Sequence, residues 1–202
     1  MLKIYGTSMS RANRALWGAE ELGLKFEHFP IAPGSGTRTP DQLKINPNGH
    51  VPVIDDDGVV IWESMAINLY LAEKYGKAPF WPSSVADHGR CYQWSTWAMT
   101  EVEPHTIAIF LNTRMLPEPQ RDAGLVSKSK EALVNPIKVL NDQLNSHEYL
   151  LGKDFTVADL NVASVVSLGL LVGVEFSSAP AAKAWIAKCT SRPASQKART
   201  YK

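Results

Sequence analysis

A proline inside an apolar run places the strongest constraint on how this chain folds. Pro52 interrupts the run Val51–Ile54, and proline lacks the N–H group that the interior of a strand needs. Pro52 therefore belongs at a strand start, an edge or a bulge, and we expect the Val51–Pro52 bond to be cis. A cis bond turns the N–H and carbonyl groups of Val51 outward, where an extended peptide can pair with them.

A carboxylate and a hydroxyl stand together a few residues later. Glu63 and Ser64 open a helix predicted over Ser64–Tyr75. As the expected N-cap, Ser64 offers its hydroxyl, the free N–H groups of the first turn and the positive end of the helix dipole to a carboxylate. Glu63 suits an amine. The two residues together indicate a small peptide ligand that carries both an amine and a carboxylate.

The first 76 residues are expected to alternate strand and helix. The patterns predict the following order: strand Leu2–Thr7, helix Arg11–Leu22, strand Phe26–Ile31, irregular loop Pro33–Pro47 with room for one helical turn, hairpin Val53–Trp62 and helix Ser64–Tyr75. This order, β-α-β, loop, β-β-α, predicts an α/β domain over residues 1–76.

The rest of the chain is expected to be helical. A linker over residues 77–86 contains Pro79 and Pro82, and an all-helical domain follows over residues 87–202. Helices are predicted over Asp87–Met115, Arg121–Ser146, Thr156–Leu171 and Pro180–Thr190. Thr156 and Asp159 have capping-box spacing, so we expect Asp159 to order its helix and to have no catalytic role.

Composition and charge exclude several classes of partner. The formal net charge is +1, so no long-range field attracts nucleic acid or anionic lipid. Cys91 and Cys189 lie far apart, and the five histidines show no metal-ligand spacing, so neither a disulfide framework nor a metal is expected. The apolar stretch Val157–Phe176 is interpreted as a buried helix instead of a membrane span. With no signal-peptide pattern at Met1, these features predict a soluble cytoplasmic protein.

Several motifs, in this order and spacing, resemble one family. Val51-Pro52 before a hairpin, Glu63-Ser64 at a helix start, and the Thr156/Asp159 box are similar to a bacterial cytosolic glutathione S-transferase with a serine- or threonine-type active site. The segments that carry the likeness further are Tyr5–Trp17, Trp62–Tyr75 and Ala98–Pro104. The resemblance implies a thioredoxin-like N-terminal domain, an all-α C-terminal helical bundle, a homodimer and a role in detoxification.

The resemblance also implies how glutathione is held as co-substrate. Ser64 binds the γ-glutamyl carboxylate, and Glu63 or a carboxylate of a partner subunit binds the amine. Val51 pairs its backbone with the cysteinyl segment, Pro52 fixes that geometry, and His50 stands near the glycyl carboxylate. No metal is implied.

Three hydroxyls in the loop after the first strand are candidates for activating the glutathione thiol. Ser10 is slightly favoured over Thr7 from the pattern of related sequences, and Ser8 lies between them. The loop has no cysteine, which counts against the thiol-disulfide branch of the family. Tyr5 lies inside the expected strand and is interpreted as a packing residue, so a tyrosine-type site is the weaker alternative.

The leading functional hypothesis is an enzyme, a glutathione S-transferase that conjugates the glutathione thiolate to small hydrophobic electrophiles. A glutathione-dependent isomerase, dehalogenase or peroxidase using the same site is the second hypothesis. The third is a non-catalytic binding module with the same fold. Interaction with nucleic acid or a membrane is not expected.

Overall fold

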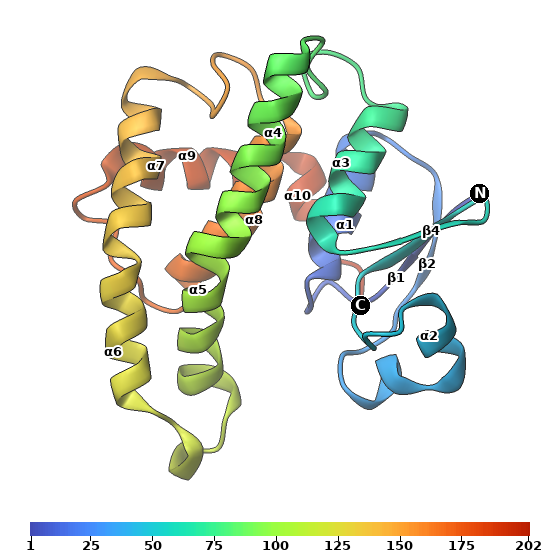
Figure 1. Cartoon of the computed structure of the whole chain (residues 1–202), viewed down its shortest axis with the longest axis horizontal. Helices are drawn as coiled ribbons and strands as arrows, with labels where there is room; N and C mark the ends of the chain where they lie inside the picture. Colours follow the sequence, from blue (N-terminus) through green and yellow to red (C-terminus); the bar gives the residue numbers. More distant parts are fainter. The chain divides into compact units, whose positions relative to one another are not determined.

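Four short strands near the start of the chain form one mixed sheet. The computed structural model describes residues 1–202, and its strands follow the order β2-β1-β3-β4 (Figure 1). β1 pairs parallel with β2 and antiparallel with β3, which in turn pairs antiparallel with β4. The bounds are β1 Leu2–Tyr5, β2 Phe26–Phe29, β3 Val53–Asp56 and β4 Val59–Trp62. The predicted strands and hairpin are confirmed.

A two-residue turn joins β3 to β4. Asp57 and Gly58 both have positive φ, 51° and 92°. A type I′ hairpin requires positive φ at both central residues, and Asp-Gly is a favoured pair for it. The local sequence therefore sets the hairpin register, in which Val53 lies opposite Trp62.

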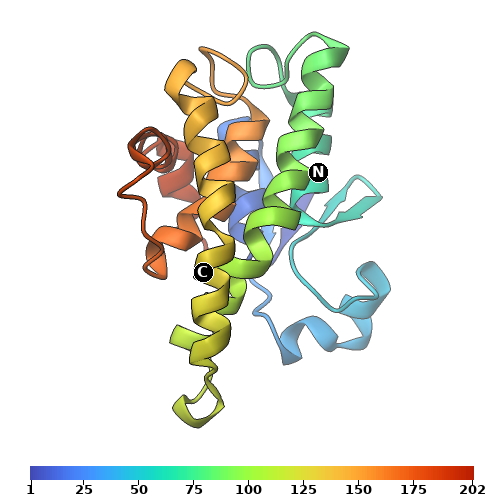
Figure 2. The same ribbon diagram turned by 60° about the vertical axis from the view of Figure 1, so that its left-hand side comes forward.

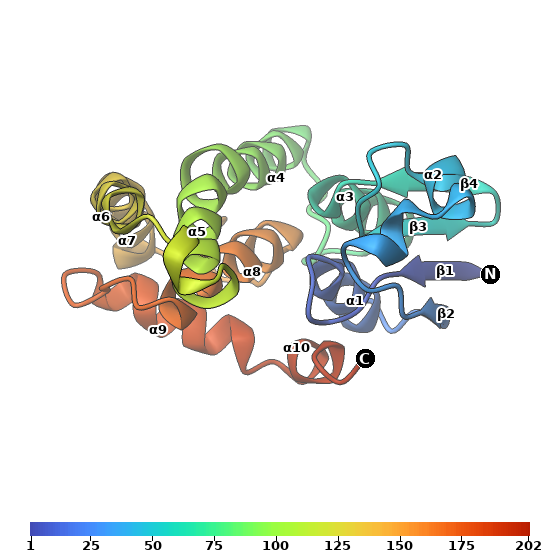
Figure 3. The same ribbon diagram turned by 90° about the horizontal axis from the view of Figure 1, so that it is seen from below.

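Helices α1 (Ala12–Glu21) and α3 (Ser64–Tyr75) cover one face of the sheet (Figures 1 and 3). Their apolar side chains and those of β1 and β3 form the core of this layer, where Ile4, Leu16, Ile54, Ile67 and Leu71 are fully buried. The 33–47 segment contains more helix than expected, namely η1 (Ser35–Arg38) and α2 (Pro40–Ile45). The result is a thioredoxin-like domain.

The chain divides into two compact units, residues 1–82 with 191–202, and residues 83–190. The split at Pro82 falls inside the linker proposed for residues 77–86. The last twelve residues, however, join the first unit, whereas the sequence analysis assigned them to the helical domain. They contain a helix that was not predicted, α10 (Pro193–Ala198), which packs on α1 (Figure 3). Charge pairs with Glu20 and Glu21 of α1 hold this segment, and no local pattern announces such contacts.

The second unit is entirely helical, as predicted. Its successive segments are α4 (Val85–Trp97), η2 (Ala98–Val102), α5 (Glu103–Phe110), η3 (Leu111–Met115), η4 (Glu118–Gln120), α6 (Ala123–Ala132), α7 (Val134–Ser146), α8 (Val157–Leu171) and α9 (Pro180–Thr190). Figure 2 shows the α4–α5 run in green beside the α6–α7 run in yellow. None of the helices is both long and apolar enough to cross a bilayer.

One helix boundary was predicted wrongly. The single helix expected over Arg121–Ser146 is two helices that meet at Leu133. Pro136 has no N–H to bond to the carbonyl of Ala132, four residues earlier, so the hydrogen-bond ladder is interrupted there. The sequence analysis took the apolar spacing as continuous and gave this proline too little weight.

The capping box at the start of α8 is confirmed. The Asp159 carboxylate accepts hydrogen bonds from the N–H and hydroxyl of Thr156, both at 2.9 Å. It also accepts from the N–H of Leu150 at 2.8 Å and the indole N–H of Trp185 at 3.0 Å. Asp159 is fully buried, so its four donors replace the water that it loses. Its role is structural, as the spacing indicated.

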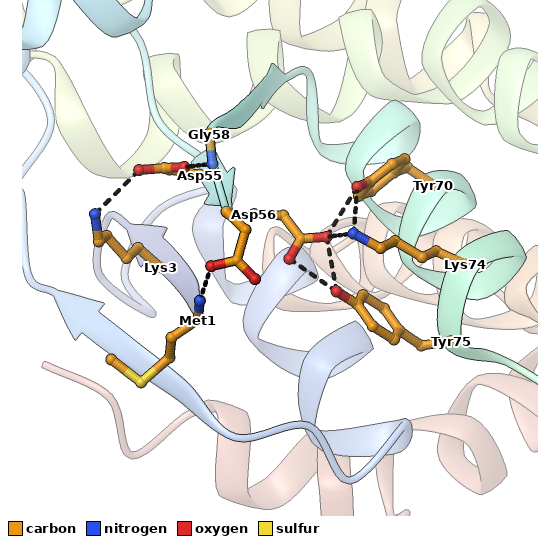
Figure 4. A network of polar contacts seen from close by, with 9 residues as sticks. Met1, Lys3, Asp55, Asp56, Gly58, Tyr70, Lys74 and Tyr75 are labelled. Carbon is orange, nitrogen blue, oxygen red and sulfur yellow. Dashed lines mark hydrogen bonds and ion pairs between the residues drawn. The ribbon is translucent and has the colours of Figure 1, made fainter.

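A second buried carboxylate ties α3 to the end of β3. Asp56, 1% exposed, accepts from the Lys74 ammonium at 2.7 Å and from the Tyr70 and Tyr75 hydroxyls at 2.8 Å (Figure 4). Burial alone raises the pKa of Asp56, but the hydrogen bonds from Lys74, Tyr75 and Tyr70 outweigh it and hold the pKa below the ordinary aspartate value. The charged form is thus the one that the fold stabilises.

Asp56→Asn tests this anchor. Because the folded-state pKa lies below the unfolded one, the stabilisation is complete above the unfolded value near pH 4 and is lost as pH falls through the folded value. We expect the substitution to lower the free energy of unfolding by about 2–3 kcal/mol at pH 7. Urea titrations should show the difference from wild type shrinking between pH 5 and pH 3. An equal loss at both pH values would show that the charge is not what matters.

Candidate functional site

Three backbone segments meet at Gly6, immediately after β1. A Cβ atom placed on Gly6 would lie 2.5 Å from the Cβ of Ala12 and 3.0 Å from the Cβ of Val51. Real Cβ contacts are longer than this, and Gly6 also has a φ of 121°, so only glycine fits. The close approach brings the loop after β1, the start of α1 and the Val51-Pro52 segment together.

Val51 presents an unpaired main chain at this place. The Val51–Pro52 bond is cis. Neither the N–H nor the carbonyl of Val51 has a hydrogen-bond partner within the protein, although its side chain is buried. These two groups can accept and donate to an extended peptide.

A buried asparagine, which the sequence analysis overlooked, shapes the turn before Val51. The Asn46 amide donates to the carbonyl of His50 at 2.8 Å and accepts from the N–H of Asn48 at 3.0 Å. The motif Asn46-Pro-Asn-Gly carried the signal, since asparagine side chains commonly hold turns. The His50 side chain itself is exposed.

Ser64 lies at the N-terminus of α3, nearly buried at 3% exposure. The sequence analysis placed Ser64 at the N-cap, but the structure has Glu63 there and Ser64 as the first helical residue. The free N–H groups of the first turn still surround its hydroxyl. The helix dipole adds positive potential at the same place, so the site suits an anion.

Arg14 of α1 makes the Ser64 hydroxyl oxygen a hydrogen-bond acceptor within the protein. The Arg14 guanidinium, 5% exposed, donates from Nη1 to Ser64 Oγ at 3.3 Å. Arginine has only donors, so the serine oxygen accepts and its own proton remains available to a ligand. No local pattern marks Arg14, which is not one of the apolar positions of α1, so its contact with Ser64 is visible only in the fold.

Glu63 has an unusual backbone conformation. Its φ is 74° and its ψ 114°, and its side chain is exposed and caps nothing. A non-glycine residue held in such a region costs about 1–3 kcal/mol, and such residues cluster at ligand sites. The hairpin and α3, which flank Glu63, impose this conformation.

Glycine should relieve the strain at Glu63, whereas alanine should not. We expect Glu63→Gly to be more stable to unfolding than Glu63→Ala by about 1 kcal/mol, since both lose the carboxylate and only glycine tolerates the φ. Thermal unfolding of the two variants, compared side by side, measures this. An alanine variant as stable as the glycine variant would mean that the backbone is not strained.

The three candidate hydroxyls make different hydrogen bonds. The Ser10 hydroxyl donates to the Thr7 carbonyl at 2.8 Å and accepts from the N–H of Ala12 at 3.1 Å. The Ser8 hydroxyl donates to the carbonyl of Arg199 at 3.1 Å. No protein group bonds to the Thr7 hydroxyl. Ser10 therefore sits at the start of α1, Thr7 is an available donor, and Ser8 is engaged elsewhere.

Tyr5 has the surroundings of a packing residue. Its ring stacks on Phe29 with centroids 4.7 Å apart. Burial, the main cause, raises the pKa of its phenol above the usual value. These contacts are those of a packing residue inside β1.

The site combines three kinds of polar group. It offers an unpaired main-chain strand at Val51, an anion site at Ser64, and alcohol side chains at Thr7 and Ser10. No group of three or more His, Cys, Asp or Glu side chains is placed to hold a metal ion.

The chain is similar to known proteins over nearly its whole length. The models of the glutathione S-transferase N-terminal and C-terminal domains match residues 1–73 and 102–193. Glutathione S-transferase 3 of Zea mays is 32% identical and covers 97% of this chain and 92% of its own. A theta class glutathione S-transferase from Xanthomonas axonopodis pv. citri, solved with glutathione bound, superposes with a TM-score of 0.86 at 29% identity, covering 100% of this chain and 98% of its own.

One relative carries a different name. Elongation factor 1-gamma 2 of Oryza sativa subsp. japonica is 31% identical over 171 residues, which are 81% of this chain and 39% of that protein.

The chain has a thioredoxin-like domain followed in sequence by a helical domain. This is the domain order of the two-domain transferases that the two family models describe. The chain belongs to the glutathione S-transferase family and is an enzyme of that family.

Proposed function

We propose that this enzyme conjugates the thiolate of glutathione to small hydrophobic electrophiles. The observation that carries the proposal is the Ser64 hydroxyl at the N-terminus of α3. Its oxygen accepts a hydrogen bond from Arg14, so its own proton can be donated to a ligand. A γ-glutamyl carboxylate matches that donor in charge and size. The unpaired main chain of Val51 then suits the cysteinyl segment of the same tripeptide.

The remaining contacts follow from this placement. Glu63, exposed beside Ser64, faces the γ-glutamyl amine, with a carboxylate of a partner subunit as the alternative. Pro52 fixes the segment that carries Val51, and the exposed His50 side chain serves the glycyl carboxylate. Each of these roles is a proposal that rests on the family membership and on the position of the residue.

The free-energy requirement for thiol activation is modest. A thiol with a pKa near 8.5 must be lowered by about two units, or about 2.7 kcal/mol, to be mostly ionised at pH 7. One hydrogen bond to a charged group supplies roughly 1.5–3 kcal/mol and a helix N-terminus about 0.3–1 kcal/mol. A single hydroxyl is therefore sufficient.

Ser10 and Thr7 are expected to stabilise the thiolate by nearly the same free energy. Ser10 has the helix N-terminus and the polarising N–H of Ala12, but it must give up its bond to the Thr7 carbonyl, about 0.5–1.5 kcal/mol. Thr7 gives up nothing and gains less from the helix. We propose Ser10 as the thiol-activating residue with Thr7 as the alternative, while Ser8 acts only through the loop.

Conjugation of glutathione to a dinitrohalobenzene, followed by absorbance, tests the function. We expect wild type to be active and Ser10→Ala to lower kcat by about tenfold or more, since one charge-assisted hydrogen bond is lost. Thr7→Val is the matched variant. A loss confined to Thr7→Val would transfer the role to that residue, and full activity in both variants would refute the hydroxyl mechanism.

Ser64 and Arg14 should act as one unit in binding glutathione. We expect Ser64→Ala to weaken the affinity about tenfold or more by calorimetry, because a charge-assisted hydrogen bond is removed. Arg14→Met should then weaken binding in the wild-type background but by less than about twofold in the Ser64→Ala background. Lys74→Met, which destabilises the same domain away from the site, is the control. Additive losses would show that Arg14 does not act through Ser64.

The alternatives make different products at the same site. A glutathione-dependent isomerase, dehalogenase or peroxidase needs the same thiolate and differs only in its second substrate. The alternative of a non-catalytic binding module rests on the similarity to a protein named elongation factor 1-gamma 2. Such a module would bind glutathione and yield no conjugate, so calorimetry and the absorbance assay together distinguish it.

The assembly and location are also proposals. β4 is an edge strand with Val59, Val60 and Trp62 partly exposed, at 47%, 42% and 39%. An exposed apolar edge strand is able to pair with another chain, and exposed apolar patches mark interaction sites, which supports a homodimer. Cys91 and Cys189 are both buried and lie outside any disulfide, which suits the reducing cytoplasm.

A further inference from the structure

Residues 199–202, here called the return segment, run back to the loop that carries the candidate catalytic hydroxyls. The N–H of Ser8 donates to the carbonyl of Tyr201 at 2.9 Å, and the Ser8 hydroxyl donates to the carbonyl of Arg199 at 3.1 Å. Both donors of Ser8 are thus used by a segment that begins 191 residues later in the sequence, at Arg199.

The loop has few other restraints between its ends. Gly6 is held by its N–H bond to the Phe29 carbonyl at 2.9 Å, and Ser10 is held at the start of α1. Met9 is 90% exposed, so its side chain packs on nothing that fixes the loop. Inside the loop, the Thr7 carbonyl accepts from the N–H and the hydroxyl of Ser10, at 3.0 Å and 2.8 Å. The return segment supplies the hydrogen bonds that hold Ser8 from outside the loop.

The return segment is itself firmly anchored within the same domain. The Tyr201 hydroxyl donates to Glu20 of α1. Its ring lies 5.4 Å from that of Phe26 and meets that of His28 edge-on at 5.1 Å, centroid to centroid. His28 in turn contacts the Gly6 carbonyl through Nε2 at 2.8 Å. Tyr201 therefore links α1, β2 and the loop.

We propose that the return segment is a positioning element of the active site: by fixing Ser8, it aims the flanking hydroxyls of Thr7 and Ser10 at the glutathione sulfur. This inference rests on the proposed function of those hydroxyls. Small errors in the placement of reacting groups cost large factors in rate, so two hydrogen bonds at the centre of a short loop are sufficient to matter. In this proposal Arg199 and Tyr201 act through Ser8 and are positioning residues.

Tyr201 remains a constant anchor over the pH range of thiol ionisation. Burial and then the hydrogen bond to Glu20 raise its pKa to about 12. The phenol therefore keeps its proton while a bound thiol is titrated. A change in the apparent thiol pKa then reports a change in the position of the loop hydroxyls and not ionisation of Tyr201.

A chain that ends at Ala198 tests the proposal, together with Tyr201→Ala in the full chain. We expect both to lower kcat by about tenfold and to raise the pKa of bound glutathione, read from the ultraviolet absorbance of the thiolate. The affinity for glutathione should change by less than about threefold, since Ser64 and Val51 lie on other elements. Tyr201→Phe, which keeps the ring and the main chain, should retain most of the activity.

Arg192→Met is the matched control. It breaks the ion pair between Arg192, which directly precedes α10, and Glu21 of α1, and it changes no residue of the return segment or of the loop after β1, so kcat and thiol pKa should stay at wild-type values. If the shortened chain does not fold, as judged by circular dichroism, Tyr201→Ala decides the matter alone.

Two failures are distinguishable. A wild-type chain that binds glutathione without lowering its thiol pKa would remove the proposed function. An active wild type, with kcat and thiol pKa unchanged in Tyr201→Ala, would overturn only the positioning role.

Discussion

The close approach of three backbone segments at Gly6 makes the candidate site possible. Any side chain at Gly6 would collide with Ala12 and Val51, and the end of β1 would be pushed away from both. The loop hydroxyls and the unpaired main chain of Val51 would then lie too far apart to hold one small peptide. The absence of a Cβ at Gly6 therefore lets the loop hydroxyls and the main chain of Val51 lie close together.

The polar residues of the site differ in which of their hydrogen-bond donors and acceptors are already used within the protein. Arg14 can only donate, so Ser64 is left with a proton for an anion. Ser10 both donates and accepts within the loop, Ser8 is committed to the return segment, and the Thr7 hydroxyl has no protein partner. Four hydroxyls in similar sequence surroundings thus have four different capacities, which depend on what lies opposite each in space.

Local signals in the sequence predicted the parts of the fold that local physics controls. Asp57-Gly58 specified the hairpin, and the Thr156/Asp159 spacing specified the start of α8. Pro52 and Glu63-Ser64 located two of the segments that form the site. The helix break at Leu133 was also predictable, because Pro136 marks it.

Features that depend on contacts between distant segments were not predictable from one sequence. No local pattern indicates a role for Arg14 of α1, and only the packing of α3 beside α1 brings it to Ser64. The placement of α10 and Tyr201 against α1 and β2 rests on pairings across almost the full length of the chain. The choice among Thr7, Ser8 and Ser10 depends on the same long-range contacts.

A crystal structure of the protein with glutathione bound tests the central claim most directly. The γ-glutamyl carboxylate should lie on Ser64 and the N–H groups at the start of α3, the cysteinyl segment should pair with the main chain of Val51, and the sulfur should lie within hydrogen-bond distance of the Ser10 or Thr7 hydroxyl. Glutathione bound elsewhere, or with its sulfur directed away from both hydroxyls, would contradict it.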